Sequence, residues 1–93
     1  MKTLSNNAEL YEYLQLLSKV LEERHAKELS EIMAHASRTS AGNVSTEFLG
    51  ESRIALRTLI KEEHGVLTSQ ERDDVRDVLS QIDGAFGRKL YQV

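Results

Sequence analysis

Two glutamate–histidine pairs have the spacing that metal-binding helices use. Glu22 and His25 are three residues apart, and Glu31 and His35 are four apart, so each pair would lie on one side of a helix. A di-iron helical bundle uses two Glu-x-x-His motifs together with further inward-facing carboxylates. This chain has one such motif, and it lies in a strongly polar stretch. We therefore interpret these residues as a surface charge cluster and expect no metal and no other cofactor.

A basic pattern lies near the middle of the chain. Arg53, Arg57 and Lys61 recur every four residues and would form a stripe that could hold phosphate or an acidic partner. Glutamates in the same segment offset this charge, and no aromatic residue interleaves with it to stack on bases. The formal net charge of -3 also argues against general nucleic-acid binding. We do not expect nucleic acid as a partner, although a small helical nucleic-acid-associated regulator is an alternative.

Acidic residues gather in two segments. Glu28 is the last residue of the polar stretch 22–28 and Glu31 follows shortly after, and Asp73, Asp74 and Asp77 occur together later in the chain. Carboxylates near a helix start suit the helix dipole, which is a purely structural explanation for the aspartates. Proteins also keep such clusters to meet a basic partner, because complementary charge accelerates association. We predict these five residues as partner-binding residues.

Two apolar features could add an anchor to such a surface. Tyr11 and Tyr13 fall on different sides of one predicted helix, and we expect Tyr11 to be the exposed one and to contact a partner. The segment Phe48-Leu-Gly-Glu-Ser52 contains a notch of two small residues. We interpret the notch as a site of close helix packing. The alternative is that the segment exposes one of its first two residues to a partner.

Patterns of catalysis and of membrane insertion are missing from the sequence. It contains no cysteine, no Gly-x-Ser-x-Gly, no phosphate-cradling glycine loop and no dinucleotide fingerprint. We therefore predict no catalytic residue and no enzyme. The N-terminal segment lacks the apolar core of a signal peptide, and no apolar run approaches transmembrane length. We expect a cytoplasmic protein without a membrane partner.

Four helices would position these residues. With no proline and only five glycines, the composition favours helix over strand. Apolar residues at 3–4 spacing predict helices over about 7–24, 26–37, 46–64 and 69–86. We predict an all-α fold, a single-domain bundle spanning residues 1–93. A short polar arm at 1–6 and a frayed end at 88–93 would flank the bundle.

The boundary between the first two helices has two interpretations. One continuous helix could cross the polar stretch, or the first helix could end near Arg24 with His25 in the left-handed conformation. We favour the break, because the apolar pattern is interrupted over the seven residues 22–28. A continuous helix would lose two turns of core contact there, which is a large loss in a small domain.

The other helix ends carry capping signals. Asn6 or Asn7 can cap the first helix, and Ser45 or Thr46 the third. Gly65 is a natural left-handed terminator for the third helix. The fourth helix would begin at Thr68-Ser-Gln-Glu71, which matches a capping box, and would end near Gly87.

Two stretches of the sequence resemble those of a known functional class of proteins. The stretches Leu21-Glu-Glu-Arg-His-Ala-Lys-Glu-Leu29 and Thr46-Glu-Phe-Leu-Gly-Glu-Ser-Arg-Ile-Ala-Leu56 are similar to those of the small acidic all-helical immunity and antitoxin proteins that are encoded beside bacterial toxins. The resemblance implies a bacterial protein that binds a toxin domain and blocks its active site. If that toxin were a nuclease with a basic cleft, the acidic faces of this chain would make the contact. The class shares no functional residue that could be carried over to this sequence.

We therefore predict a non-enzymatic protein-binding module, most concretely an immunity protein whose partner is a basic toxin domain. A homodimeric structural or regulatory helical protein is the alternative. A chain of 93 residues has a thin core, and self-association can cover the apolar surface that the core leaves.

Overall fold

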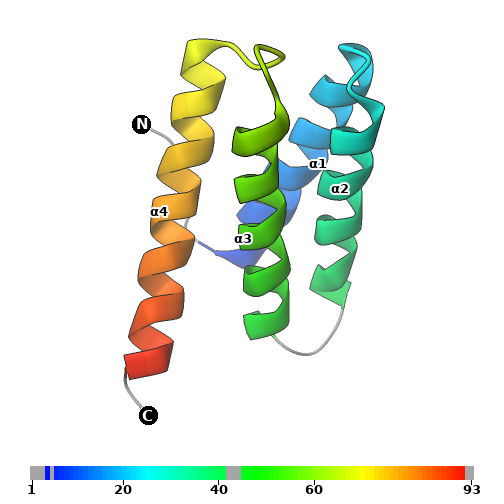
Figure 1. The fold of residues 1–93 in the computed structure, drawn as a ribbon. Coiled ribbons are helices and arrows are strands. Elements are labelled where there is room, and N and C mark those ends of the chain that lie inside the picture. Colours follow the sequence, from blue (N-terminus) through cyan, green and yellow to red (C-terminus); the bar gives the residue numbers. More distant parts are fainter. Residues whose placement is uncertain (1–3, 5, 42–44, 92–93) are drawn as a thin grey trace.

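The computed structural model describes residues 4, 6–41 and 45–91 (Figure 1). This part of the chain contains no strand. Its elements are α1 (Asn7–Glu23), α2 (Lys27–Arg38), the short 3-10 helix η1 (Thr39–Ala41), α3 (Ser45–Glu62) and α4 (Ser69–Tyr91). The all-α fold with four helices that the sequence predicts is confirmed.

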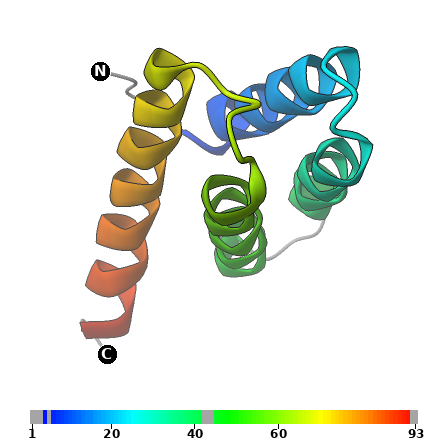
Figure 2. The same cartoon turned by 45° about the horizontal axis from the view of Figure 1, so that its top comes forward.

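Helix α3 lies between α2 and α4, which stand on its opposite sides (Figures 1 and 2). Helix α1 packs against α2, and α3 packs against both α2 and α4. Figure 2 shows α1 running across one end of this arrangement, at an angle to the other helices. The last turns of α4 extend beyond the ends of α2 and α3 in Figure 1.

The core is built from one apolar stripe of each helix. Its buried residues are Leu10, Tyr13, Leu14, Leu17 and Leu21 of α1, Leu29, Met33 and Ala36 of α2, Phe48, Ala55, Leu56 and Leu59 of α3, Leu67 in the connection, and Val75, Val78 and Ile82 of α4. Among the side chains that the structure describes, Ile82 is the last buried one. The buried residues of α4 that the structure describes therefore lie between Val75 and Ile82.

The break between α1 and α2 occurs where the sequence predicts it. His25 has a φ of 65°, the left-handed conformation that ends a helix. The Ala26 N–H donates to the Leu21 carbonyl at 2.8 Å, and the His25 N–H donates to the Glu22 carbonyl at 3.1 Å. These two bonds form a Schellman motif with histidine in the position that usually holds glycine.

Two serines hold α1 and α2 close together. The Ser18 hydroxyl donates to the Ser30 carbonyl at 2.9 Å, and the Ser30 hydroxyl donates to the Ser18 carbonyl at 2.7 Å. Each hydroxyl thus reaches the backbone of the neighbouring helix, so the two helices approach closely at this level. Ser30 is buried and Ser18 is half-buried.

Two predicted helix starts are confirmed by their hydrogen bonds. The Glu9 N–H donates to Asn6 Oδ1 at 2.9 Å, which selects Asn6 over Asn7 as the cap of α1. At the start of α4, the Thr68 N–H donates to Glu71 Oε1 at 2.8 Å and the Glu71 N–H donates to Thr68 Oγ1 at 3.1 Å. This reciprocal pair is the expected capping box.

Other boundaries differ from the prediction. Helix α3 already includes Ser45, so its cap lies outside the described residues. Helix α4 continues through Gly87 to Tyr91, five residues past the expected end. A glycine in a helix interior costs only about 1 kcal/mol. Gly87 alone therefore does not end a helix whose preceding turns carry an apolar stripe. Residues 1–3, 5 and 92–93 of the two predicted end segments also lie outside the described part of the chain.

Candidate functional site

A groove with an apolar floor and an acidic rim runs between α2 and α3. Ile32 and Ala36 of α2 face Ile54 and Ala55 of α3 across a hollow of about 560 Å³. Ile54 is 62% exposed, the highest value among the large hydrophobic residues described. Ile54 therefore exposes apolar surface to solvent at this groove.

Three glutamates surround that floor. Glu28 and Glu31 line the groove from α2, and Glu51 lines it from α3, together with His35 and Thr58. No basic side chain within the described ranges forms an ion pair with any of the three glutamates. The rim is therefore a concentration of uncompensated negative charge beside apolar surface.

The groove continues toward the turn between α1 and α2. A second hollow shares Glu28, Ile32 and Thr58 with the first one and extends to Glu62 of α3 and to Lys27 at the start of α2. Its walls come from α2 and α3, with His25 and Ala26 of the α1–α2 turn and Glu63 and Val66 of the α3–α4 connection. The combined surface follows the length of α2, whose twelve residues span about 18 Å.

The aspartates of α4 lie elsewhere. Asp73 is exposed, whereas Asp74 and Asp77 are half-buried, and Asp74 accepts a hydrogen bond from Gln70 Nε2 at 3.0 Å. Burial, followed by the nearby charges of Asp74, Glu71 and Asp77, raises the pKa of Tyr13 above its usual value. Asp74 and Asp77 therefore lie toward Tyr13 of α1, whereas Asp73 is exposed to solvent.

The structure does not bring the predicted acidic residues into one surface. Glu28 and Glu31 lie in the groove between α2 and α3, and the aspartates belong to α4 on the other side of α3 (Figure 1). Tyr11 is 40% exposed on α1, as expected, but it lines neither the α2–α3 groove nor its extension. The predicted partner-binding residues therefore lie in three separate places: the α2–α3 groove, α4 and the exposed side of α1.

The basic stripe of α3 is offset by α4. Arg53 Nε donates to Asp83 Oδ1 at 2.6 Å, and Arg57 Nη2 lies 3.6 Å from the same oxygen. Lys61 is exposed. The sequence predicts that glutamates of the same helix segment offset the stripe, but the structure shows one carboxylate of the neighbouring helix engaging two of its three members.

Glu63, which follows the last residue of α3, has a different role. Glu63 is 5% exposed and bonds to Arg72 Nε at 3.0 Å. Its other oxygen accepts from the backbone N–H groups of Gly65 and Leu67, each at 3.0 Å. The Leu67 hydrogen bond is the largest cause of the lowered pKa of Glu63, and Arg72 adds to it. Glu63 thus organises the connection between α3 and α4.

The glutamate–histidine pairs lie at the surface. Glu22 and His25 are exposed at the end of α1, while Glu31 and His35 are exposed along the α2–α3 groove. Within the described ranges, no group of three or more histidine, aspartate or glutamate side chains is arranged to hold a metal ion.

The notch at the start of α3 packs inward. Phe48 is buried, so the alternative in which this ring is exposed to a partner is wrong. Ser52 is 0% exposed, and its hydroxyl has no hydrogen-bond partner among the described residues. Leu49 is half-buried and lines a further hollow on the other side of α3.

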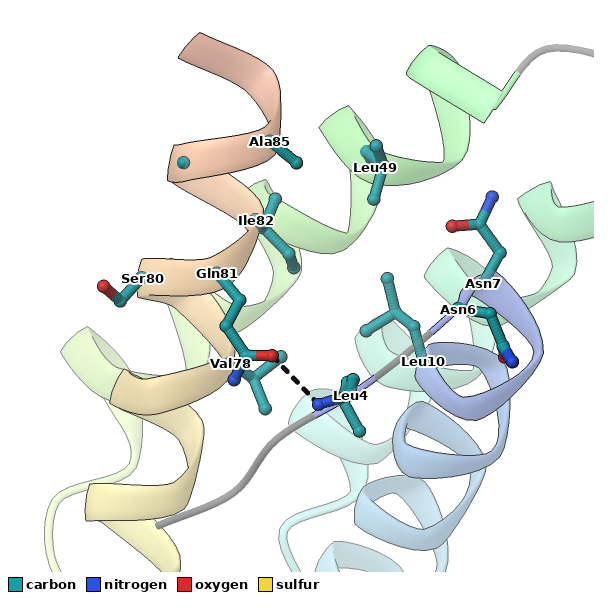
Figure 3. A pocket seen from close by; sticks show the side chains of 11 residues that line it. Leu4, Asn6, Asn7, Leu10, Leu49, Val78, Ser80, Gln81, Ile82 and Ala85 are labelled. Carbon is teal, nitrogen blue, oxygen red and sulfur yellow. Dashed lines mark hydrogen bonds between the residues drawn. The ribbon is translucent and has the colours of Figure 1, made fainter. Parts of the chain in front are cut away.

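That further hollow lies between α4 and the first turns of α1 and α3 (Figure 3). Leu4 lies across it, and its N–H donates to Gln81 Oε1 at 2.9 Å. Leu10 and Leu49 point toward Ile82 across the opening. The predicted polar arm is therefore attached to α4 at Leu4.

Ile54 and Glu51 of the α2–α3 groove are not among the site residues that the sequence predicts. Ile54 does not belong to the stripe of Ala55, Leu56 and Leu59, and an apolar residue off the stripe is a signal of exposed apolar surface. Glu51 gave no separate signal, because its position beside Ile54 is apparent only once α2 lies against α3.

No helix in the described residues combines the length and apolar character needed to cross a membrane. No protein-family model matches the chain, and searches of curated proteins and of solved structures also find no match.

Proposed function

We propose that this chain is a non-enzymatic protein-binding module whose α2–α3 groove takes a basic segment of a partner protein. The observation that supports this proposal is the grouping of Glu28, Glu31 and Glu51 around the exposed Ile54. Apolar surface supplies binding free energy when it is removed from water. The uncompensated carboxylates favour a partner that carries Lys or Arg beside its own apolar residues, and they repel acidic ones.

The most concrete form of the proposal is an immunity-type inhibitor of a bacterial toxin domain. A nuclease needs a basic cleft to hold phosphates, and a row of carboxylates occupies such a cleft by the same electrostatic attraction. The small size and the acidic balance of the chain suit a protein made to cover one site on another protein. The resemblance in style to immunity proteins supports the same role.

The test uses two triple variants that are matched in charge. Glu28→Gln, Glu31→Gln and Glu51→Gln together raise the formal net charge from -3 to 0, and so do Asp73→Asn, Asp74→Asn and Asp77→Asn together. The tagged wild-type chain and both variants are used to capture partners from extracts of the native host, followed by mass spectrometry. We expect one basic protein to be retained by the wild type and by the aspartate variant, and to be lost with the glutamate variant.

The affinity for that protein is then measured by calorimetry at low and high salt. We expect the glutamate variant to bind at least about tenfold more weakly and with a smaller salt dependence. Equal weakening by both variants would show an effect of net charge rather than of the groove. Weakening by the aspartate variant alone would place the interface on α4.

The toxin-inhibitor form has its own test. The captured protein is expressed alone and together with this chain, and cell growth is recorded. We expect growth arrest that the wild-type chain relieves and the glutamate variant does not. A captured protein that is harmless when expressed alone contradicts the toxin form and leaves the groove as a binding site for another partner.

A further inference from the structure

The α2–α3 groove has carboxylates at both of its ends and apolar side chains between them. Helices α2 and α3 lie side by side and run in opposite directions (Figures 1 and 2). Glu28 and Glu62 line the groove at the end near the α1–α2 turn, and Glu51 lines the other end. Ile32 and Ile54 lie between these ends. Eleven positions of α3 separate Glu51 from Glu62, which is about 16 Å along the helix axis.

Negative charge dominates this groove. Glu31 lines the rim between the two ends, and Lys27 is the one lysine or arginine among the described residues that line either hollow, beside two histidines. The three residues between η1 and α3, which the structure does not describe, are glycine, asparagine and valine and carry no charge. The ion pairs in the described part of the chain include none of the four carboxylates, which are Glu28, Glu31, Glu51 and Glu62. A ligand with positive charge at both ends of an apolar stretch complements this pattern.

The walls of the groove pair their own backbone groups. Both walls are α-helices, whose N–H and C=O groups bond along the helix axis. The hydroxyl of Thr58, in the middle of the groove, donates to the Ile54 carbonyl at 2.9 Å. An extended segment that lies on Ile32 and Ile54 would hold its own N–H and C=O groups against apolar side chains, and each unpaired group opposes binding. A helical segment pairs these groups internally and avoids this cost.

We propose that the partner segment in this groove is an amphipathic α-helix of about three turns, apolar along one face and with Lys or Arg near both ends of that face. A third helix that lies along two neighbouring ones places a row of its side chains into the groove between them. About eleven helical residues span the distance from Glu51 to Glu62, whereas an extended segment spans it with about five. The inference rests on the proposed function, because it gives the conformation of the basic segment that the groove takes.

Three synthetic peptides of about 14 residues test this conformation. The first carries leucine at helical spacing on one face, lysine near both ends and alanine elsewhere. The second is identical except that proline replaces a central alanine away from the leucine face. Proline keeps the charge and the leucines but breaks a helix. The third carries glutamate in place of lysine.

Each peptide is titrated up to about 1 mM into the isotope-labelled full chain, and NMR amide shifts report where it binds and how tightly. We expect the first peptide to shift residues along α2 and α3 and to gain helical content in circular dichroism when bound. We expect the proline peptide to bind at least about tenfold more weakly. The glutamate peptide should leave these shifts unchanged, because the groove repels it.

Two exposed aliphatic positions provide matched variants of the chain. Ile54 lies in the groove and is 62% exposed, whereas Leu16 lies on α1, outside both hollows of the groove, and is 54% exposed. Ile54→Ser should weaken binding of the first peptide at least about fivefold, because it removes apolar surface from the contact. Leu16→Ser should leave the affinity unchanged. Circular dichroism verifies that each variant retains its helical content.

The outcomes separate this inference from the proposed function. A proline peptide that shifts the same residues and binds as tightly as the first one overturns the helical conformation, and the groove then takes an extended basic segment. The absence of shifts along α2 and α3 with both lysine peptides overturns the inference and the groove as a binding surface for basic segments. Binding that Leu16→Ser weakens and Ile54→Ser does not overturns them as well.

Discussion

Arg24 and Glu71 form a two-point ion pair that joins the end of α1 to the start of α4. Both terminal nitrogens of the guanidinium donate to the carboxylate, and the Nη2–Oε2 distance is 2.9 Å. Arg24 Nη1 also donates to the Val66 carbonyl at 3.1 Å. The same carboxylate accepts the Thr68 N–H in the capping box. One side chain therefore serves a local helix cap and a contact between residues 47 positions apart.

This arrangement predicts acid sensitivity. The hydrogen bonds from Arg24 and then from Thr68 lower the pKa of Glu71 from 4.5 to about 2. Because the folded-state pKa is depressed, the stabilisation is fully present above the unfolded value and is lost as the pH falls toward about 2. We expect the thermal midpoint to decrease steadily between about pH 5 and pH 2. Calorimetry across this range measures it.

Glu71→Gln separates the charge from the cap. Glutamine still accepts the Thr68 N–H, because Gln also serves in the capping box, but it cannot pair as an anion with Arg24. We expect a lower midpoint near neutral pH and a flatter dependence below pH 5. A variant that loses stability in acid as steeply as the wild type contradicts the assignment to Glu71.

Glu63 is predicted to be the carboxylate whose removal destabilises the fold most. Glu63→Ala leaves the Gly65 and Leu67 N–H groups and the Arg72 guanidinium without their acceptor. We expect a loss of about 2–3 kcal/mol in the free energy of unfolding. Urea denaturation measures it, with Glu62→Ala at the exposed neighbour as the control, where we expect a change within about 0.5 kcal/mol. Equal effects at the two positions would contradict the role given to Glu63.

The two left-handed turns predict opposite responses to substitution. His25 pays a conformational cost at φ 65° that glycine avoids, so His25→Gly should stabilise the protein by up to about 1 kcal/mol. Gly65 has φ 90°, and Gly65→Ala should destabilise it by about 1 kcal/mol even though a Cβ atom there meets nothing within 4 Å. Thermal denaturation of both variants checks the signs. A destabilised His25→Gly would mean that the imidazole makes a contribution beyond its backbone conformation.

Ser52 offers a substitution at the buried start of α3. Its hydroxyl is fully buried without a hydrogen-bond partner among the described residues, and such a group opposes folding. Ser52→Ala should therefore raise the free energy of unfolding by about 1 kcal/mol. Ser37→Ala is the contrasting variant, because the equally buried Ser37 hydroxyl donates to the Ala34 carbonyl at 2.7 Å and its loss should not stabilise. Denaturant titration compares the two.

The features that the sequence predicts correctly are local ones. The Asn6 cap, the turn at His25 and the Thr68–Glu71 capping box each depend on residues within a few positions of one another. The apolar stripes likewise follow from the period of one helix, and they are sufficient for the all-α fold.

The features that the sequence does not reveal depend on how helices pack. Arg24 meets Glu71, and Arg53 meets Asp83, across long separations in the chain. The groove lined by Glu51 and Ile54 exists only because α2 lies against α3. Charged residues on separate helices have many possible partners in the sequence, and the interhelical geometry selects one. From the sequence, the five predicted acidic residues could have formed one surface. In the structure they lie on two, the α2–α3 groove and α4.

The reciprocal bonds of Ser18 and Ser30 also set a limit on sequence variation. Each hydroxyl spans the gap to the opposite backbone, and the separation of packed helices depends on the side chains at their contact. A larger residue at either position would push α1 away from α2 and open the core on both sides. Among related chains, these two positions should accept serine, alanine and glycine only, while the neighbouring exposed position Lys19 should vary freely.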